Sequence, residues 1–541
     1  MPTKYIVVTG GVLSGLGKGI AAASIGFLLS SQKRVIPVKC EGYLNIDPGT
    51  MNPIEHGEVF VLDDGEEADM DFGHYERFLG ISCKAHWNVT MGKIYQSIFE
   101  KERKGEYLGK TVQMIPHVTD QIKETWKSIA EEENADVMLI EIGGTVGDIE
   151  TEMHIEAARQ LKHDLGEENV CYIHLTYVPI PPGVGEQKSK PTQQSVGLLR
   201  QKGIQPDIII GRCSEYLEEG IKKKIATFCD VSPRAVITGL DVDSIYKIPL
   251  VFYNEGLMDI LNEKLQMNVR PNLREWSDLV QNIAKADDEL TIAIAGKYTA
   301  LEDSYASVVE AIHHACAHLK ARPRILWVET TNAQELLKLE EADAIIVPGG
   351  FGTRGVEGKI DVIRFARENR IPFLGICLGL QLAVVEHARN KCELPDAHSA
   401  EMKEHATHCV VDILPEQKGI TQKGGTMRLG AYEAVILKDS LVYRLYNAQK
   451  VSERHRHRYE VNPEYHQVLE TRGLRFSGKS ENGRLVEFLE RTDHPFFVAT
   501  QAHPELKSSL LKPAPLFFGL CAAALHIKKE RETLARAEKT S

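Results

Sequence analysis

Short apolar runs that alternate with longer helical stretches constrain the fold of this chain most. The N-terminal part shows the pattern: a β-rich run at residues 4–9, a glycine-rich loop at residues 10–19 and a helical apolar pattern at residues 20–31. Further apolar runs follow at residues 35–39, 137–142, 170–178 and 207–211. Strands that alternate with helices pair in parallel, so the sequence predicts an α/β fold built on a parallel sheet.

A second α/β domain is expected after residue 289. Between residues 266 and 289 the chain turns polar, contains a helix-breaking proline and ends in an acidic run. Fresh apolar runs then follow at residues 290–295, 325–328, 344–347 and 373–376. The sequence therefore predicts two domains, each a mainly parallel sheet flanked by helices. Their predicted bounds are residues 1–267, a linker at residues 268–289, and residues 290–541.

Composition argues against several classes of protein. The 541 residues carry a formal net charge of −12, whereas a general nucleic-acid binder needs a basic face. The ten cysteines are scattered and form no CxxC pair, which fits a reducing compartment better than a zinc ribbon or a disulfide framework. No apolar run is long enough to span a membrane, and the stretch at residues 5–8 is too short for a secretory signal. We therefore expect a cytoplasmic protein that binds neither nucleic acid nor membrane.

The segment PFLGICLG at residues 372–379 predicts a reactive cysteine. It places Cys377 between Gly375 and Gly379, directly after an apolar strand, which is the cysteine form of the nucleophile elbow. The glycines let the chain turn sharply, so that amides at the start of the next helix point at the thiol and favour its ionised form. The alternative is a buried structural cysteine in a tight turn.

Two other segments favour the reactive cysteine. The run AIIVPGGFG at residues 344–352 is a strand that ends in glycines, and it can present a backbone amide to an oxyanion. In the run QAHPE at residues 501–505, His503 can act as general base for Cys377. Glu505 lies two residues further on in an extended segment, so it can orient the imidazole. The predicted catalytic residues are Cys377, His503 and Glu505.

The order of these motifs resembles the class I glutamine amidotransferases, in which PGGFG is followed by GICLGLQ and then HPE. The resemblance implies that this domain hydrolyses glutamine and releases ammonia. One departure lies beside the base, because the family usually has a bulky apolar residue where this chain has Ala502. The smaller side chain would loosen the packing beneath His503 and leave the reactive groups intact.

A second motif lies in the glycine-rich loop near the N-terminus. The run GGVLSGLGKG at residues 10–19 follows a strand and opens a helix, and it resembles a P-loop. Its amides and Lys18 would cradle phosphates at the helix N-terminus. It departs from the strict motif, because Val12 replaces a glycine and Gly19 stands where Ser or Thr would hold magnesium. A glycine-rich turn without a ligand is the alternative.

Two acidic residues are candidates for the magnesium ligands that this loop lacks. Glu141 lies near the end of an apolar strand, and Asp71 lies in the run DMDFGHY at residues 69–75. An acid at the carboxyl end of a strand beside a phosphate loop is well placed for Mg²⁺. Either acid alone would more often be a surface residue.

Lysines supply local positive charge in this acidic chain. The run KSKPTQ at residues 188–193 and the three lysines at residues 222–224 are candidates for a second triphosphate site. The alternative is that these lysines are solvated surface residues.

Longer segments across the chain resemble the CTP synthase family. They are GGVLSGLGKG, NIDPGTM, HGEVFV, GHYERF, EIGGTVGDIE, KSKPTQ and VDSIYKIP in the N-terminal half, and GGTMRLGA and RHRHRYEVN in the C-terminal half. The resemblance runs from Tyr5 to about residue 526. It implies a P-loop amidoligase domain, similar to dethiobiotin synthetase, followed by a class I glutaminase domain. It also implies a reaction in which ATP phosphorylates O4 of the uracil of UTP, and ammonia from glutamine displaces the phosphate at C4 to give CTP.

The resemblance assigns roles to residues that match the family's motifs. The residues implied for ATP are Gly15, Leu16, Gly17, Lys18, Gly19, Ile20, Asp71, Leu240, Asp241 and Val242, and those for the metal are Asp71 and Glu141. The residues implied for UTP are Ser14, Lys188, Ser189, Lys190, Pro191, Thr192, Gln193 and Lys224, and those for the cytosine end of bound CTP are Asp148, Ile149 and Glu150. The residues implied for glutamine are Gly350, Leu378, Gly379, Leu380, Gln381, Glu401 and Arg458. A guanidinium suits a carboxylate, so Arg458 is the expected clamp.

The same resemblance implies ligands and assembly. Mg²⁺ with ATP is the expected cofactor, and no organic cofactor is expected. ATP, UTP and glutamine are the implied substrates, GTP an activator, CTP a feedback inhibitor, and a homotetramer the assembly. Ammonia in water is protonated and loses its nucleophilicity, so an internal passage for it is expected.

Two departures concern the N-terminal half. The family commonly has Lys-x-Asp-Pro-Tyr where this chain has KCEGY at residues 39–43, and a more apolar segment where it has TEMH at residues 151–154. We expect altered geometry near the nucleotide site, and weaker inhibition by CTP if cytosine is read near residues 151–154. Two other functions stay open: a cobyrinate-like amidoligase that acts on carboxylates, and a non-catalytic assembly protein that polymerises without turnover.

Overall fold

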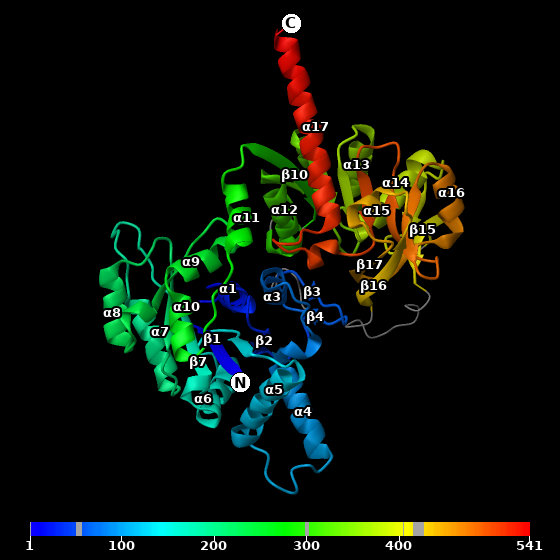
Figure 1. The fold of residues 1–541 in the computed structure, drawn as a ribbon. Helices are drawn as coiled ribbons and strands as arrows, with labels where there is room; N and C mark the ends of the chain where they lie inside the picture. Colours follow the sequence, from blue (N-terminus) through cyan, green and yellow to red (C-terminus); the bar gives the residue numbers. More distant parts are fainter. Residues whose placement is uncertain (1, 50–56, 298–301, 404, 415–426, 541) are drawn as a thin grey trace. The chain divides into compact units, whose positions relative to one another are not determined.

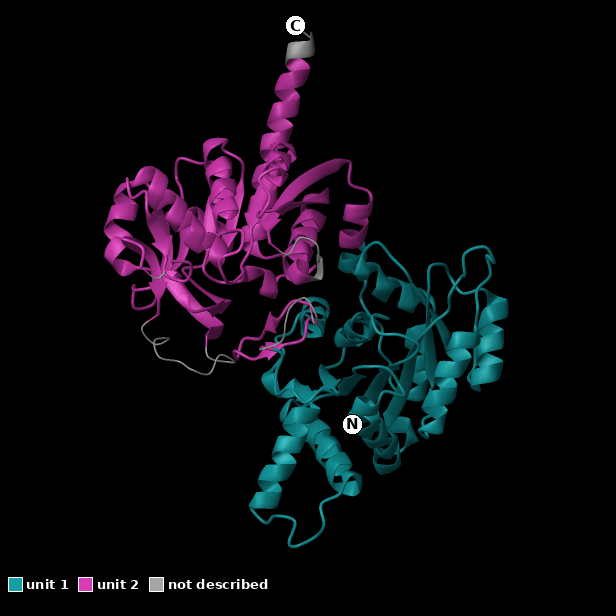
Figure 2. Cartoon of the chain, turned by 180° about the vertical axis from the view of Figure 1, so that it is seen from behind, with its two compact units in different colours: residues 1–48, 71–277 teal, residues 49–70, 278–541 magenta. Residues whose placement is uncertain are grey.

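The chain forms two compact units in the computed structural model (Figure 2). The structure describes residues 2–49, 57–297, 302–403, 405–414 and 427–540. The first unit comprises Met1–Pro48 and Asp71–Ser277, and the second comprises Gly49–Met70 and Asp278–Ser541. Thr50, Met51, His56 and residues 424–426, which belong to motifs of the sequence, lie outside the described residues.

The first unit is built on a seven-stranded sheet with the order β5-β2-β6-β1-β7-β8-β9 (Figure 1). Each neighbouring pair is parallel, which confirms the predicted parallel α/β fold. The strands are β1 Lys4–Gly10, β2 Val35–Glu41, β5 Asn88–Thr90, β6 Val137–Ile142, β7 Val170–Tyr177, β8 Ile208–Cys213 and β9 Val236–Leu240. Every residue of β1 and β6 is buried, as expected for strands with helices on both faces.

The helices of this unit lie between successive strands or, for the last two, after the final strand. They are α1 Lys18–Ser30, α3 Asp71–Leu79, α4 Met91–Arg103, α5 Thr119–Glu132, α6 Glu152–Leu165, α7 Lys190–Gln201, α8 Glu219–Cys229, α9 Ile248–Asn254 and α10 Leu257–Lys264. Helix α11 Arg274–Ala284 contains the division between the units. Strand β1 lies between β6 and β7, so the loop after β1 opens beside the carboxyl ends of both neighbours, where ligands bind in open α/β sheets.

The second unit has a nine-stranded sheet with the order β11-β10-β12-β13-β21-β20-β19-β16-β17. The five strands from β11 to β21 are parallel and were predicted in part, whereas β20, β19, β16 and β17 add antiparallel pairs that were not. The strands are β10 Asp288–Gly296, β11 Ala321–Glu329, β12 Ala344–Val347, β13 Phe373–Ile376, β16 Arg428–Ile436, β17 Lys450–His457, β19 Arg475–Ser480, β20 Val486–Glu490 and β21 Phe497–Thr500.

Two hydrophobic cores cover the two faces of this sheet. Ile345 and Val347 of β12 pack in one core, while Ala344 and Ile346 pack in the other, because successive side chains of a strand point to opposite faces. The helices are α12 Ala306–Leu319, α13 Val356–Glu368, α14 Leu378–Lys391, α15 Leu441–Tyr446, α16 His466–Thr471 and α17 Pro515–Thr540. A small sheet contains β14 Ala397–Ser399, β15 His408–Ile413 and β18 Tyr459–Val461. Among the described residues, no helix is both long and apolar enough to cross a membrane.

A hairpin from the N-terminal part of the chain packs in the second unit. Its strands are β3 Phe60–Val61 and β4 Glu67–Ala68, which pair antiparallel. Asp63, between them, accepts a hydrogen bond of 2.7 Å from the buried guanidinium of Arg454 in β17 and lies 3.1 Å from Lys507. We call residues 57–70 the strap. Its attachment to this unit was not predicted, because nothing in its sequence marks it as separate from the N-terminal half.

The ion pair of Asp63 should make the strap sensitive to acid. Burial alone would raise the pKa of Asp63, but Arg454 and Lys507 outweigh it and lower the pKa to about 2. A depressed pKa contributes stability that is complete above the unfolded value of about 4 and is lost as pH falls towards 2. We expect Asp63→Asn to lower the free energy of unfolding by about 1–2 kcal/mol at pH 7, since Asp63 is partly exposed, and to cost less at pH 3. Chemical denaturation at both pH values measures this.

The matched control is Glu481→Gln, which removes an exposed ion pair with Lys450. It should leave stability unchanged, because solvent screens exposed pairs. A cost for Asp63→Asn that is the same at pH 3 and pH 7 would contradict the ion-pair account.

Candidate functional site

The turn around Cys377 has the geometry of a nucleophile elbow. Cys377 lies between β13 and α14 with φ 51° and ψ −100°, a conformation that costs a non-glycine residue about 1–3 kcal/mol. A Cβ on Gly379 would overlap the carbonyl oxygen of Val347, and one on Gly375 would lie 2.9 Å from the backbone of Gly379. Both glycines are therefore required by close backbone contacts, and the strain falls on the residue predicted to react.

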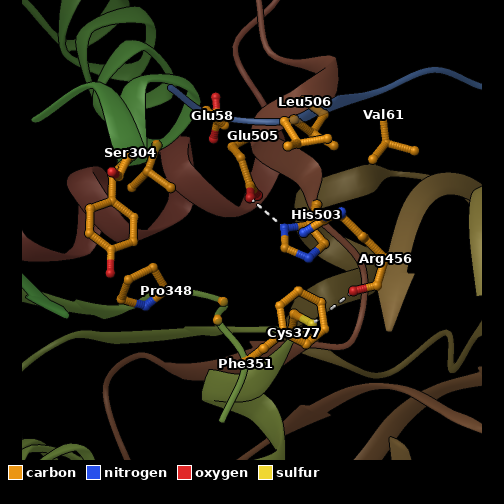
Figure 3. Close-up of a pocket in the computed structure, with 15 residues that line it drawn as sticks. Glu58, Val61, Ser304, Pro348, Phe351, Cys377, Arg456, His503, Glu505 and Leu506 are labelled. Carbon is orange, nitrogen blue, oxygen red and sulfur yellow. Dashed lines mark hydrogen bonds and ion pairs between the residues drawn. The ribbon is translucent and has the colours of Figure 1, made fainter. Parts of the chain in front are cut away.

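His503 and Glu505 form a hydrogen-bonded pair beside Cys377. His503 Nδ1 lies 2.7 Å from Glu505 Oε1, and the backbone amide of His503 donates to the carbonyl of Arg454 at 2.7 Å. Figure 3 shows the imidazole on the same side of the cavity as Cys377. Within the described part of the chain, His503 Nε2 has no hydrogen-bond partner, so it is available to a substrate. Burial lowers the pKa of His503, but Glu505 and Cys377 outweigh it and raise the pKa to about 10.

A cavity brings the predicted catalytic residues together with the glycine loop after β12 (Figure 3). Its walls come from the elbow, the loop, the strap, the start of α12 and the segment after β21. The lining residues are Glu58, Val59, Val61, Ser304, Tyr305, Val308, Pro348, Gly349, Gly350, Phe351, Cys377, Arg456, His503, Glu505 and Leu506. The strap residues and Arg456 were missed by the sequence analysis, because their place at this cavity depends on long-range contacts.

Of the residues predicted to bind glutamine, Gly350 lines this cavity. Gln381, near the start of α14, donates to the carbonyl oxygen of Tyr459 at 3.0 Å. Glu401 accepts a hydrogen bond of 2.8 Å from the amide of Gly352. Leu378, Gly379 and Leu380 form the buried first turn of α14. The guanidinium that lines the cavity itself is that of Arg456, which pairs with Glu67 of the strap at 2.7 Å.

Ala502, which precedes the base, is packed inside the second unit. Its side chain is buried, and its amide donates to Thr500 Oγ1 at 3.1 Å. The backbone of His503 is held by Arg454, and a Cβ on Gly349 would lie 2.8 Å from His503 Cε1. The imidazole thus lies against Gly349, and the loosening expected from Ala502 stays a prediction.

In the first unit, the predicted phosphate loop connects β1 to α1. Lys18 begins α1, and its Nζ donates to the carbonyl of Gly144 at 2.8 Å. Burial and the nearby Lys39 lower the pKa of Lys18, while three neighbouring acids oppose them. A Cβ on Gly19 would overlap a carboxylate oxygen of Asp71. A side chain at residue 19, such as the Ser or Thr of a strict P-loop, would therefore need Asp71 to move.

Asp71 and Glu141 converge on one positive group. Lys39 Nζ lies 2.5 Å from Asp71, 2.7 Å from Glu141 and 3.3 Å from Glu41. Burial would lower the pKa of Lys39, but these acids raise it well above its usual value, so the group is an ammonium ion. Two carboxylates that share one cation fit the predicted magnesium ligands, since Mg²⁺ uses one or two carboxylates plus phosphates. Within the described residues, no three or more His, Cys, Asp or Glu side chains form a complete metal site.

A second cavity joins the phosphate loop to the segment after β9. It brings Leu16, Gly17 and Ile20 next to Leu240, Asp241 and Val242, and so unites the two halves of the predicted ATP site. Its lining residues are Leu16, Gly17, Ile20, Ala21, Leu175, Ile210, Arg212, Gly239, Leu240, Asp241, Val242, Ile245, Ile248 and Phe252. Arg212 was not predicted. It donates to the carbonyl of Gly15 and to Asp241, each at 2.7 Å, and thereby links the two segments.

Lys188 to Gln193, which are predicted to bind UTP, lie at the start of α7. Ser189 precedes α7, and Gln193 donates to its hydroxyl at 3.0 Å. A Cβ on Gly11 would overlap Ser195 Oγ, so α7 packs directly against the phosphate loop. The predicted residues of this region are Ser14 in the loop, Lys188 to Gln193 at the start of α7, and Lys224 on α8. A common site for these residues stays a prediction.

The residues predicted for the cytosine end precede α6. Asp148 accepts from the amide of Thr145 at 2.7 Å, while Ile149 is exposed. A Cβ on Gly42 would lie 2.8 Å from Glu150 Cβ, so the larger family residue at this position would need Glu150 to move. His154 is fully buried in α6, and burial lowers its pKa to about 4, so the ring is neutral. Weaker CTP inhibition stays a prediction.

Two family models match the chain: CTP synthase N-terminus at residues 4–267, and glutamine amidotransferase class-I at residues 300–523. A protein named CTP synthase from Archaeoglobus fulgidus is 52% identical over 531 residues, which cover 98% of this chain and 100% of the relative. The chain belongs to the CTP synthase family. A CTP synthase from Borreliella burgdorferi is likewise 52% identical over 529 residues, which cover 96% of this chain and 99% of the relative.

A solved structure of the CTP synthase family is similar to the C-terminal part. It is the glutaminase domain of Trypanosoma brucei CTPS with bound acivicin, which is 40% identical, and the match covers 43% of this chain and 93% of that domain with a TM-score of 0.41.

Proposed function

We propose that the chain makes CTP from UTP, ATP and glutamine. UTP, ATP, glutamine and water give CTP, ADP, phosphate and glutamate. The observation that carries the proposal is the match to CTP synthases along almost the whole chain, together with the residues in each unit. One unit holds Cys377 beside the His503–Glu505 pair. The other holds Lys18 near Asp71 and Glu141, two carboxylates that both pair with the ammonium of Lys39.

Glutamine hydrolysis uses the first of these arrangements. Cys377 gives its thiol proton to His503, and the sulfur then attacks the side-chain carbonyl carbon of glutamine, while the amides of the loop and of α14 stabilise the oxyanion. His503 is protonated at neutral pH, because its pKa is about 10, and it gives a proton to the departing ammonia. Water then attacks the thioester, with His503 as base, and releases glutamate and the thiol. Arg458 binds the α-carboxylate, and Gln381 and Glu401 orient the substrate.

Amination of UTP uses the second arrangement. The loop from Gly15 to Ile20 holds the phosphates of ATP, and Lys18 neutralises charge on the transferred phosphoryl group. Asp71 and Glu141 would hold Mg²⁺, which supplies charge neutralisation when bound. The γ-phosphoryl group moves to O4 of UTP and ADP leaves. Ammonia attacks C4, loses a proton, and phosphate departs with the former O4. GTP is the proposed activator, and CTP the feedback inhibitor that binds near Asp148 to Glu150.

Supplying different acceptors tests this function against its rival. The purified chain, with ATP and glutamine, should form ADP and CTP when UTP is added. The rival amidoligase would instead consume ATP with carboxylate acceptors. Formation of ADP and an amide from a carboxylate, without reaction of UTP, would overturn the proposal.

The proposed homotetramer is supported by exposed apolar side chains on α4 and the loop that follows it. The exposed fractions are 64% for Phe99, 86% for Leu108, 46% for Met114 and 51% for Ile115. Phe99 also lines a groove with Leu44, Ile46 and Tyr95. Large exposed apolar side chains that gather in one region mark association surfaces.

Phe99→Glu should therefore dissociate the assembly. Light scattering should show a tetramer for the unchanged chain with ATP and UTP, and a smaller species for the variant. Leu534→Glu, on the exposed part of α17, is the matched control and should stay tetrameric. A tetramer of undiminished stability in Phe99→Glu would exclude this surface.

A further inference from the structure

A buried lysine lies behind the glycine loop of the glutaminase cavity. Lys359, in the first turns of α13, is only 1% exposed. Its Nζ donates to the carbonyl oxygen of Pro348 at 3.2 Å. Of the described residues, no carboxylate lies within ion-pair distance of this nitrogen. Burying an amine that can carry charge costs folding free energy unless a partner compensates, so its presence calls for a reason beyond packing.

The lysine is one of three side chains that hold the loop from Pro348 to Gly352. Lys359 holds the carbonyl of Pro348, and Lys297 holds the carbonyl of Phe351. Glu401 accepts from the amide of Gly352 at 2.8 Å. Both ends of the loop are therefore fixed by side chains from other elements of the same unit.

The loop separates Lys359 from the reacting groups. A Cβ on Gly349 would lie 3.6 Å from Cys377 Cβ and 2.8 Å from His503 Cε1. A Cβ on Gly350 would lie 3.8 Å from Lys359 Nζ. In a planar trans peptide the carbonyl and the amide point in opposite directions. A Pro348 carbonyl that is fixed towards Lys359 thus fixes the direction of the amide of Gly349, a residue that lines the cavity.

The electrostatic surroundings of Lys359 disfavour its charged form, so the buried lysine lowers the stability of the fold. Burial lowers the pKa of Lys359 to about 7, and Lys297 adds to this effect, while Cys377 and Glu329 oppose it. A lysine whose folded pKa lies below its unfolded value near 10.4 destabilises the fold most at pH 7 and below. The cost fades as pH rises towards 10.

We infer that Lys359 is a positioning residue for glutamine hydrolysis, which fixes through Pro348 the loop whose amides stabilise the oxyanion on the substrate. The inference rests on the proposed glutaminase activity and adds a residue that does not touch glutamine. It predicts that the lysine is kept at the expense of stability, because a well-packed apolar residue of similar length would fold at least as well.

Lys359→Met in the full-length chain tests the inference. We expect kcat for glutamine hydrolysis to fall about tenfold or more, less than the roughly 10²–10³-fold that follows loss of an oxyanion donor itself. KM for glutamine should stay within about twofold, because the loop acts mainly on the transition state. Tm at pH 7 should be equal to or higher than that of the unchanged chain. Arg364→Met, on the exposed face of the same helix, is the matched control and should change none of these values.

The outcomes separate the inference from the proposed function. If the unchanged chain hydrolyses glutamine and Lys359→Met keeps its kcat, the inference fails while the proposed function stands. If kcat falls together with Tm and with the ammonia-dependent rate of the same preparation, the residue is merely structural, and the inference also fails. No hydrolysis by the unchanged chain would overturn the proposed function itself. Should Lys359→Met fail to fold, Lys359→Leu carries the same prediction.

Discussion

Cys377→Ala should lose glutamine-dependent CTP synthesis by about 10⁴-fold or more and keep ammonia-dependent synthesis. Cys377 sulfur is the nucleophile that attacks glutamine in the proposed hydrolysis, and the backbone hydrogen bonds of the strained turn do not involve the sulfur. The amide of Cys377 donates to Thr500, and Gln381 donates to Tyr459, whatever the side chain at residue 377. Rates of CTP formation with glutamine and with ammonium chloride give the comparison.

The matched control for this variant is Cys409→Ala, a half-buried cysteine of the same unit. It should keep both activities. Loss of the ammonia-dependent reaction in Cys377→Ala would contradict the proposed division of labour between the two units.

Asp71→Asn should remove CTP synthesis with either source of nitrogen, by about 10²–10³-fold. Its carboxylate lies against Gly19 of the phosphate loop and 2.5 Å from Lys39 Nζ, where it and Glu141 share one cation. The neutral side-chain amide of Asp71→Asn, in place of the carboxylate, cannot balance the charge of Mg²⁺ or of the Lys39 ammonium. The lost step precedes the use of ammonia, so both nitrogen sources should fail equally.

Asp164→Asn, at an ion pair of α6 with Lys123, is the control and should keep full activity. If Asp71→Asn lost only the glutamine-dependent reaction, this residue would act in glutamine hydrolysis and not in the phosphorylation of UTP, which would contradict its proposed role. Dependence of the rate on Mg²⁺ concentration gives a second readout, since the variant should need more of the metal.

The parallel strands could be predicted because each is a short apolar run. β1, β6, β12 and β13 are buried along their whole length, and a strand with helices on both faces has no polar positions to obscure it. β16 and β17 were missed, since they mix buried, half-buried and exposed residues without a regular pattern and carry several charges. Such strands depend on their partners more than on their own composition.

Some residues of the candidate sites could likewise be predicted from the sequence, and others could not. Cys377 and Lys18 belong to contiguous motifs whose glycines are imposed by local backbone geometry, so the sequence alone indicates them. Arg212, Lys359 and Asp63 act through contacts with residues distant in the sequence. The sequence around a lysine or an acid that makes such long-range contacts does not differ from the sequence around one on the surface. Only the fold shows which of them are buried.

Transfer of the side-chain nitrogen of glutamine to CTP is the step that tests the proposed synthesis best. The purified chain is given UTP, ATP, Mg²⁺, GTP and glutamine labelled with ¹⁵N at the side-chain amide, and the CTP is analysed by mass spectrometry. The account predicts CTP that carries the label on its C4 amino group, in one-to-one ratio with glutamate. Unlabelled CTP, or release of labelled ammonia without any CTP, would contradict it.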